Sequence, residues 1–181
     1  MSSLAPTLSS DPDVLVHGLT TVELQALSAK CLEARETAYC PYSLFRVGCA
    51  ILLRSSPTHD PLHLSSTPII TGANVENASY PVGTCAERVA MATAIIQGYR
   101  RGSFKAVAVA TDMDDFCSPC GMCRQFLREF CEDETPIIMH AKTGQYKVKM
   151  LGELLPMSFG PEALPKRELL EVYHTEKPKT T

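Results

Sequence analysis

The stretch CSPCGMCRQ, residues 117–125, places three thiols at three-residue intervals, at Cys117, Cys120 and Cys123. Pairs of the form C-x-x-C occur in zinc sites, in redox centres and as ordinary buried cysteines. If a helix begins here, Cys120 and Cys123 lie on one face of it, because residues three apart on a helix are neighbours. Soft thiolate ligands select zinc over the harder divalent ions. Alone, however, this motif leaves metal binding, redox chemistry and a buried structural role all open.

A second stretch, TCAERVA (residues 84–90), adds a thiol and a carboxylate at the start of another expected helix. The N-terminus of a helix favours a thiolate such as that of Cys85, through its free N–H groups and its dipole. Glu87 follows two residues later, where its carboxylate can face the same ion without binding it. An acid in a first helical turn is common, but one flanked by a thiolate ligand and Arg88 is much less common by chance. The sequence therefore predicts two helix starts that converge on one zinc ion.

Whether this zinc is catalytic or structural depends on Cys117. Four cysteines would close the site, whereas the three ligands Cys85, Cys120 and Cys123 leave one position open for chemistry. Cys117 precedes Ser-Pro and lies outside the turn that Cys120 and Cys123 share. A closed site would also leave Glu87 without a role. The sequence favours the open site, although spacing alone does not exclude the closed one.

The two stretches CAER (residues 85–88) and SPCGMCRQ (residues 118–125) resemble the zinc-dependent cytidine deaminases, in particular their small homotetrameric type with three cysteine ligands. They match the signature H-x-E…P-C-x-x-C in its three-cysteine variant, with Cys85 in the histidine position. The resemblance continues through YCPYSLFRVG, NVENASYPVGTCAER and ELLPMSFGPEAL, and so covers most of the chain. The loop at residues 55–68 and the two tails depart from the compact members of the family.

The resemblance implies hydrolysis of free cytidine and deoxycytidine to uridine and deoxyuridine plus ammonia, a reaction of pyrimidine salvage. One Zn²⁺ per subunit would supply hydroxide at neutral pH, and Glu87 would shuttle protons to the ring and to the leaving ammonia. Three thiolates give the site a net charge of −1 and weaken this acidification. Arg88 and Arg124 are expected to offset that charge by hydrogen bonds to the sulfur atoms.

The resemblance also assigns residues to the substrate. Asn74 and Glu76 would hold the ribose, Phe45 would pack on the pyrimidine, and Ala86 would bind the substrate. Phe159 would enter a neighbouring subunit's site, which implies a homotetramer. From the residues alone, Asn74 and Glu76 would be taken as turn residues that satisfy local backbone, and Phe45 could equally be an ordinary core phenylalanine.

Composition bears on the rival functions. A deaminase that acts on RNA or DNA needs a basic channel for phosphates, whereas this chain has 17 Lys and Arg against 20 Asp and Glu. A non-catalytic zinc protein would require Cys117 as a fourth ligand. No apolar run approaches the ~20 residues that span a bilayer, and no signal peptide is visible. We therefore expect a cytoplasmic protein, with the nucleus not excluded, that binds neither nucleic acid nor membrane.

The helices and strands that must position these residues can be predicted from the spacing of hydrophobic residues and from the capping, glycine and proline residues at their ends. Thr20 and Glu23 form a capping box that opens a helix with Leu24, Leu27, Cys31, Ala34 and Ala38 on its apolar face. The remaining expected elements are strands at 45–54, 69–75, 106–112, 136–140 and 146–150, and helices at about 84–98 and from Pro119 onward. This order predicts a three-layer α/β domain, with helices on both faces of a mixed five-stranded sheet.

The last two strands are joined by AKTGQ, which is too short for a parallel crossover, so they should form an antiparallel hairpin. We expect one domain over residues 1–181, with loose tails at about 1–12 and 176–181 and a surface loop at 55–68.

Overall fold

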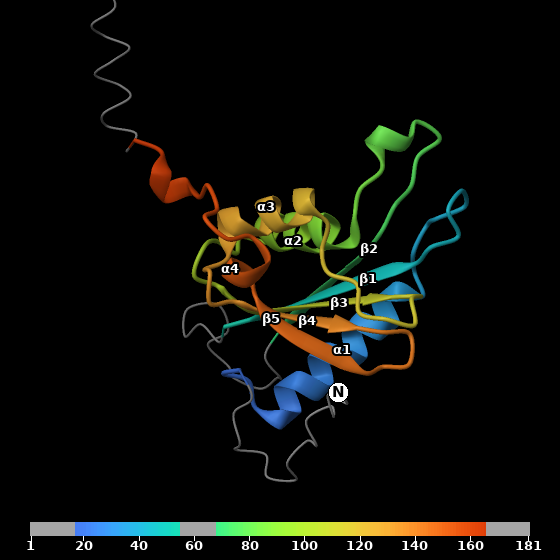
Figure 1. Ribbon diagram of the computed structural model, residues 1–181, viewed down its shortest axis with the longest axis horizontal. Helices are drawn as coiled ribbons and strands as arrows, with labels where there is room; N and C mark the ends of the chain where they lie inside the picture. The colour runs from blue at the N-terminus through green and yellow to red at the C-terminus, as the bar shows by residue number, and fades with distance from the viewer. Residues whose placement is uncertain (1–16, 55–67, 166–181) are drawn as a thin grey trace, which may run out of the picture.

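A mixed sheet of five strands forms the centre of the computed structural model, which describes residues 17–54 and 68–165 (Figure 1). The strands are β1 (Val47–Leu53), β2 (Ile69–Ala73), β3 (Phe104–Thr111), β4 (Pro136–His140) and β5 (Tyr146–Met150). Their order across the sheet is β2-β1-β3-β4-β5, and only β3 and β4 run parallel to each other. The mixed sheet and the antiparallel β4–β5 hairpin confirm the prediction. The expected tails and most of the 55–68 loop lie outside the described residues.

The helices cover both faces of this sheet, as predicted (Figure 1). They are α1 (Thr21–Arg35), α2 (Ala86–Ile96), α3 (Gly121–Phe130) and the short α4 (Leu151–Leu154), with two 3₁₀ turns, η1 (Tyr80–Val82) and η2 (Pro161–Ala163). Helix α1 packs on one face, and α2 and α3 pack on the other. The turn α4 was not predicted. None of the helices in the described ranges has the length and hydropathy needed to span a lipid bilayer.

The capping box predicted at the start of α1 is present. The Glu23 N–H donates to Thr20 Oγ1 at 3.2 Å, and the Thr20 N–H donates to Glu23 Oε2 at 2.9 Å. The apolar face of α1 is buried as expected, except that Ala38 lies beyond the last helical residue, Arg35. The helix therefore ends earlier than the proline at position 41 alone would require.

Strand β1 is buried along nearly its whole length because its two faces contact two different helical layers. Cys49, Ile51 and Leu53 pack into the cluster under α2 and α3. Ala50 and Leu52 point to the opposite face and join the cluster under α1. A strand covered on both faces has no polar side, which explains why its sequence is a continuous apolar run.

Two glycines in the sheet bring α1 and α2 into backbone contact with it. A Cβ atom on Gly48 would lie 2.4 Å from the Arg35 nitrogen on α1. A Cβ atom on Gly72 would lie 2.5 Å from the Ala90 nitrogen on α2. Carbon atoms do not approach backbone this closely, so glycine is required at both positions. The height of α2 above the sheet is therefore set by Gly72.

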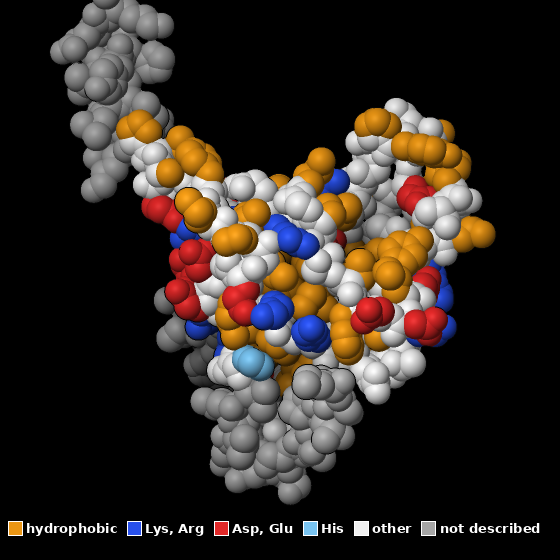
Figure 2. Space-filling model, viewed as in Figure 1, with side chains coloured by type: hydrophobic (Ala, Val, Ile, Leu, Met, Phe, Trp, Pro, Cys, Tyr) orange, Lys and Arg blue, Asp and Glu red, His pale blue; other side chains and the backbone are white. Residues whose placement is uncertain are grey.

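Two segments project from the body on the side of α2 and α3 (Figure 1). We call them the η1 projection (residues 74–84) and the η2 projection (residues 155–165). Hydrophobic side chains lie along both (Figure 2). They include Tyr80, which is 75% exposed, and Phe159, which is 60% exposed.

Candidate zinc site and substrate pocket

The three predicted zinc ligands meet at the starts of two helices. Cys85 is the N-cap of α2, Cys120 is the N-cap of α3, and Cys123 lies in the first turn of α3. Their sulfur atoms all lie within 4.8 Å of one another, and the Cys85 and Cys120 sulfurs are 4.0 Å apart. Neither N-cap thiol forms a capping hydrogen bond to its own helix, so both thiols are available to bind the same metal ion.

This donor set fits one zinc ion. Zinc–thiolate bonds of about 2.3 Å in a tetrahedral arrangement place two sulfur atoms about 3.8 Å apart, close to the separation of Cys85 and Cys120. The hydrogen bond from the Cys123 thiol, with contributions from Arg88, lowers the pKa of Cys85 to about 5. A thiolate is the form that binds metal, so the cluster is prepared for a cation.

Cys117 lies outside this cluster. In residues 17–54 and 68–165, the thiols placed to share one ion are those of Cys85, Cys120 and Cys123. The Cys117 thiol instead contacts the Ser118 carbonyl oxygen at 3.7 Å, and burial raises its pKa. Three protein ligands leave one tetrahedral position for a non-protein ligand, which is the arrangement of catalytic zinc sites.

Glu87 is the buried carboxyl group beside the thiols. It is 3% exposed, and burial, together with the nearby Cys85 thiol, raises its pKa above the ordinary value. It also shares a hydrogen bond with the Cys123 thiol. A buried carboxyl with a raised pKa can both accept and return a proton near neutral pH. The structure therefore places Glu87 as a proton carrier next to the metal ligands, while Glu87 itself is not a metal ligand.

Arg88 lies against the cluster, as expected. Its guanidinium hydrogen-bonds the Cys85 and Cys123 thiols, and its Nη2 donates to the Gly83 carbonyl oxygen at 3.2 Å. Its Nε is buried without a hydrogen-bond partner in the described part of the chain. A positive group with a spare donor beside three sulfur atoms favours their thiolate form.

Arg124 makes different contacts from those expected. Its Nε and Nη1 donate to the carbonyl oxygens of Pro119 and Leu154, at 2.7 and 2.8 Å. Its Nη2 donates to Ser118 Oγ at 2.6 Å. These bonds hold the loop that leads into Cys120, so the contacts of Arg124 place it in support of that loop rather than on the sulfur atoms.

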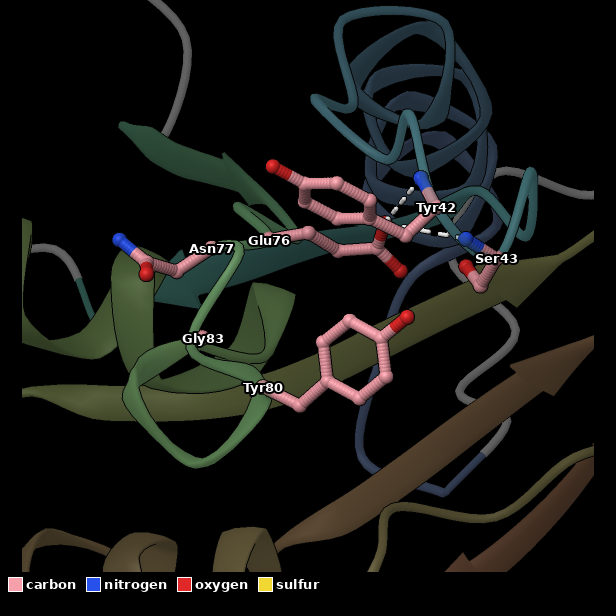
Figure 3. Close-up of a pocket in the computed structure, with 6 residues that line it drawn as sticks. All are labelled: Tyr42, Ser43, Glu76, Asn77, Tyr80 and Gly83. Atoms are coloured by element: carbon pink, nitrogen blue, oxygen red, sulfur yellow. Dashed lines mark hydrogen bonds between the residues drawn. The ribbon is translucent and has the colours of Figure 1, made fainter.

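Glu76 lines a cavity of about 270 Å³ on the η1 projection. The other lining residues are Tyr42, Ser43, Asn77, Tyr80 and Gly83. The Tyr42 and Tyr80 rings flank the Glu76 carboxylate, with their centroids 5.8 Å apart (Figure 3). Glu76 Oε2 accepts hydrogen bonds from the Tyr42 and Ser43 N–H groups at 3.0 and 3.2 Å (Figure 3). The Ser43 side chain also hydrogen-bonds the Glu76 carboxylate, and this bond, followed by the two backbone bonds, lowers the pKa of Glu76.

Asn74 links the η1 projection to the start of β1. Its Oδ1 accepts from the Val47 N–H at 2.8 Å, and its Nδ2 donates to the Phe45 carbonyl oxygen at 2.9 Å. A side-chain amide has two donors and two lone pairs, so one of each remains beyond these bonds. Asn74 therefore positions the chain at Phe45 and keeps the capacity to contact a hydroxyl group.

The other predicted substrate residues are dispersed. Phe45 is partly buried beside Asn74, and Ala86 is fully buried between Cys85 and Glu87. Phe159 lies on the η2 projection and is not among the residues that line the Glu76 cavity.

Sequence reasoning missed the residues that surround Glu76, namely Tyr42, Ser43, Asn77, Tyr80 and Gly83. Tyr42 and Ser43 come from the α1–β1 connection, and no local pattern shows that this connection folds over the η1 projection. The available signal was two tyrosines next to prolines, at 41–42 and 80–81. This pattern is common in exposed turns that bind nothing.

Residues 21–139 match the family model described as the cytidine and deoxycytidylate deaminase zinc-binding region. The chain belongs to this deaminase family. It is 38% identical to a cytidine deaminase of Sporosarcina psychrophila over 143 residues, which are 79% of this chain and 96% of the relative. It is 44% identical to a probable cytidine deaminase of Dictyostelium discoideum over 110 residues, 58% of this chain and 66% of that relative.

Solved structures of the family have the same fold. The cytidine deaminase of Burkholderia pseudomallei superposes with a TM-score of 0.66 at 37% identity, covering 75% of this chain and 98% of that one. The enzyme of Mycobacterium tuberculosis gives 0.60 at 33% identity, covering 76% and 98%. Family membership and the three-cysteine cluster agree, and this deaminase is a zinc-dependent hydrolase with one Zn²⁺ per chain.

Proposed function

We propose that this deaminase hydrolyses free cytidine and deoxycytidine to uridine and deoxyuridine, with release of ammonia, in pyrimidine salvage in the cytoplasm. The observation that carries the proposal is the buried Glu87 carboxyl beside a three-thiol cluster that excludes Cys117. That arrangement provides an open metal position and a proton carrier together. Its relatives named cytidine deaminase support the same reaction.

Zinc held by Cys85, Cys120 and Cys123 would act as a Lewis acid that makes a water molecule acidic near neutral pH. Glu87 accepts a proton from that water as its oxygen bonds to C4 of the pyrimidine, and then delivers the proton to ring N3. Glu87 next moves the remaining hydroxyl proton to the amino group, the C4–N bond breaks, and ammonia leaves. Arg88 offsets the negative charge of the three thiolates throughout.

The cavity at Glu76 accounts for a free nucleoside as substrate. Its volume of about 270 Å³ is slightly below that of most small-molecule pockets, which range over about 300–1,000 Å³. In our proposal the Glu76 carboxylate, held in place by the Tyr42 and Ser43 N–H groups, accepts a hydrogen bond from a ribose hydroxyl. The free donor of Asn74 contributes a second sugar contact, and Phe45 and Ala86 lie against the base.

We also propose that the enzyme is a homotetramer in which Phe159 of one subunit completes the site of another. Large apolar side chains lie exposed on the outer side of α2 and α3, including Ile96 at 86% and Met122 at 64%. Where exposed side chains of this kind form a contiguous patch, the patch typically marks a subunit interface. Light scattering after size exclusion tests this part of the proposal, with a mass near four times that of one chain expected.

The deciding experiment is to incubate the purified zinc-loaded protein with cytidine and follow the fall in ultraviolet absorbance as uridine forms. Single-stranded RNA and DNA serve as parallel substrates, each at low and moderate salt. We expect rapid cytidine turnover that depends little on salt, because no phosphate contacts are screened. Preference for a polynucleotide, with binding that falls steeply as salt rises, would instead indicate a nucleic-acid deaminase.

A further inference from the structure

Arg128 on α3 is buried, yet its guanidinium binds the η2 projection. It is 5% exposed, its Nε donates to Ser158 Oγ at 2.8 Å, and its Nη2 binds the Glu162 carboxylate. Asp133, 2.9 Å from Nε, balances part of its charge. A charged group this deeply buried costs free energy unless it is well paired, so these contacts determine where the η2 projection lies.

Gly160 shows how closely the backbone approaches this guanidinium. A Cβ atom at position 160 would lie 2.7 Å from Arg128 Cζ and 2.6 Å from Glu162 Oε2. The φ of Gly160 is −120°, which any residue adopts. Any side chain at position 160 would therefore have to displace the Arg128 guanidinium or the Glu162 carboxylate, because the main chain lies directly against Arg128.

These contacts enclose Phe159 on both sides. Ser158 before it and Gly160 after it both contact Arg128, and its own carbonyl oxygen accepts from Gln125 Nε2 at 2.8 Å. Its backbone is thus attached to two residues of α3, while its ring remains 60% exposed. An apolar ring held out into solvent gains nothing within its own chain, but a fixed backbone lowers the entropy lost when a partner covers the ring.

We propose that Arg128 is a positioning residue that holds Ser158 and Gly160 and thereby presents the Phe159 ring to the substrate site of a second copy of this chain. The inference rests on the proposed function, because it names the residue that makes the intersubunit contact possible. Cys123 lies on the same helix as Arg128. In this proposal, α3 therefore carries both a metal ligand of its own subunit and the residue that positions the Phe159 ring for the neighbouring subunit. A lysine cannot replace Arg128, because it lacks the planar fork that binds two partners at once.

The test is a double-mutant cycle on the zinc-loaded enzyme with Arg128→Met, Phe159→Ala and the double variant. Arg100→Met, at an exposed arginine whose side chain bonds the carbonyl oxygens of Ile95 and Tyr99, is the matched control. Each single variant should lower kcat/KM for cytidine roughly three- to tenfold, the worth of one aromatic contact. The loss should appear mainly in KM, and the double variant should be no worse than Phe159→Ala, since the two residues act as a unit.

Hydrogen exchange gives a measurement that does not depend on activity. Peptides covering residues 158–162 should exchange faster in Arg128→Met than in the wild type, whereas Arg100→Met should leave this exchange unchanged. Zinc content should remain one ion per chain in all variants. If Arg128→Met does not fold, Gly160→Ala serves in its place, because its added Cβ atom would disturb the contact between this backbone and the Arg128 guanidinium while keeping the arginine.

Three results would overturn the proposal: unchanged exchange at 158–162 in the Arg128→Met variant, full activity of Phe159→Ala, or losses that multiply in the double variant. The last result would make Arg128 a stabiliser of α3 only. A wild-type enzyme that does not act on cytidine would contradict the proposed function, and the exchange experiment would still decide whether Arg128 holds the η2 projection.

Discussion

The thiol cluster and the two projections differ in how much of each is completed within one chain. The three sulfur atoms, Glu87 and Arg88 are brought together by the starts of two helices on one sheet. The projections instead present aromatic rings to solvent, with Tyr80 75% and Phe159 60% exposed. The metal site is thus complete in a single chain, whereas the ring of Phe159 on the η2 projection remains largely exposed there.

A physical reason underlies this difference. Metal ligands need distances that are accurate to a few tenths of an ångström, which helices packed at backbone contact on a sheet can supply. A substrate needs enclosure, and rings on a projection become enclosing walls only when something covers them. The reaction centre and the Glu76 cavity are both built within one chain, whereas the Phe159 ring is left largely exposed.

The largest effects should come from the cysteines. Cys123→Ser or Cys120→Ser should lose zinc and nearly all activity, because two thiolates with one weak hydroxyl donor no longer form the three-cysteine site. Cys117→Ser is the matched control and should retain about one zinc per chain and most of its activity. Metal analysis by mass spectrometry and cytidine turnover measure both. Release of zinc by Cys117→Ser would mean that the site is closed and structural.

Next in size is Glu87→Gln, which should keep zinc but lose activity by at least ~10²–10⁴-fold, since an amide cannot carry protons. Glu134→Gln, which changes an exposed carboxylate in the loop after α3, is the control and should behave as the wild type. Single-turnover assays on samples of equal zinc content make the comparison. Near-normal activity in the zinc-loaded variant would remove Glu87 from the mechanism.

A smaller effect is expected in the η1 projection. Glu76→Ala should weaken cytidine turnover by about 1.5–3 kcal/mol, the usual worth of a hydrogen bond to a charged group. The already poor reaction of free cytosine should barely change, because cytosine has no sugar to hold. Glu33→Ala on the surface of α1 is the control. Equal losses with cytidine and cytosine would indicate that Glu76 shapes the site without binding the sugar.

The smallest expected effect concerns pH: the contribution of Glu76 to kcat/KM should not change with pH near neutrality. Hydrogen bonds from Ser43 and Tyr42 lower the pKa of Glu76 below the ordinary 4.5. A carboxylate with a lowered pKa stays ionised above its ordinary value, and its interactions are lost only as the pH falls through the lowered pKa. The ratio of wild-type to Glu76→Ala kcat/KM should therefore stay constant between about pH 7.5 and pH 5.5. A ratio that declines across this range would require a raised pKa for Glu76 and would contradict the direction of the shift that these bonds produce.

The parts of the molecule that local chemistry determines were predictable from sequence. The capping box at Thr20 and Glu23, the short β4–β5 connection and the i, i+3 pair of Cys120 and Cys123 each depend on a few neighbouring residues. Contacts between distant segments were not predictable. No nearby residue indicates that Arg128 binds Ser158, or that the side chain of Asn74 bonds the backbone at Phe45 and Val47.

Arg124 illustrates the same limit inside a recognised motif. It stands directly after Cys123, which made a hydrogen bond to sulfur a reasonable expectation. Its donors instead bond two carbonyl oxygens and a hydroxyl group around the loop before α3. The motif predicted that Arg124 lies near the thiol cluster. It could not predict its hydrogen-bond partners, because one acceptor, the Leu154 carbonyl oxygen, belongs to α4, which was not predicted.

Gly72 has a consequence for how sequence variation in this enzyme is interpreted. It lies in the edge strand β2, is only partly buried, and carries no chemical group, so a survey by burial or residue type would rank it as tolerant. Yet an added methyl group at Gly72 would clash with the backbone of α2 at Ala90 and push the helix away from the sheet. Helix α2 would shift relative to α3, and Cys85 would move with it. The substitution Gly72→Ala would then be detected first as a change in metal affinity, although residue 72 makes no contact with the metal site.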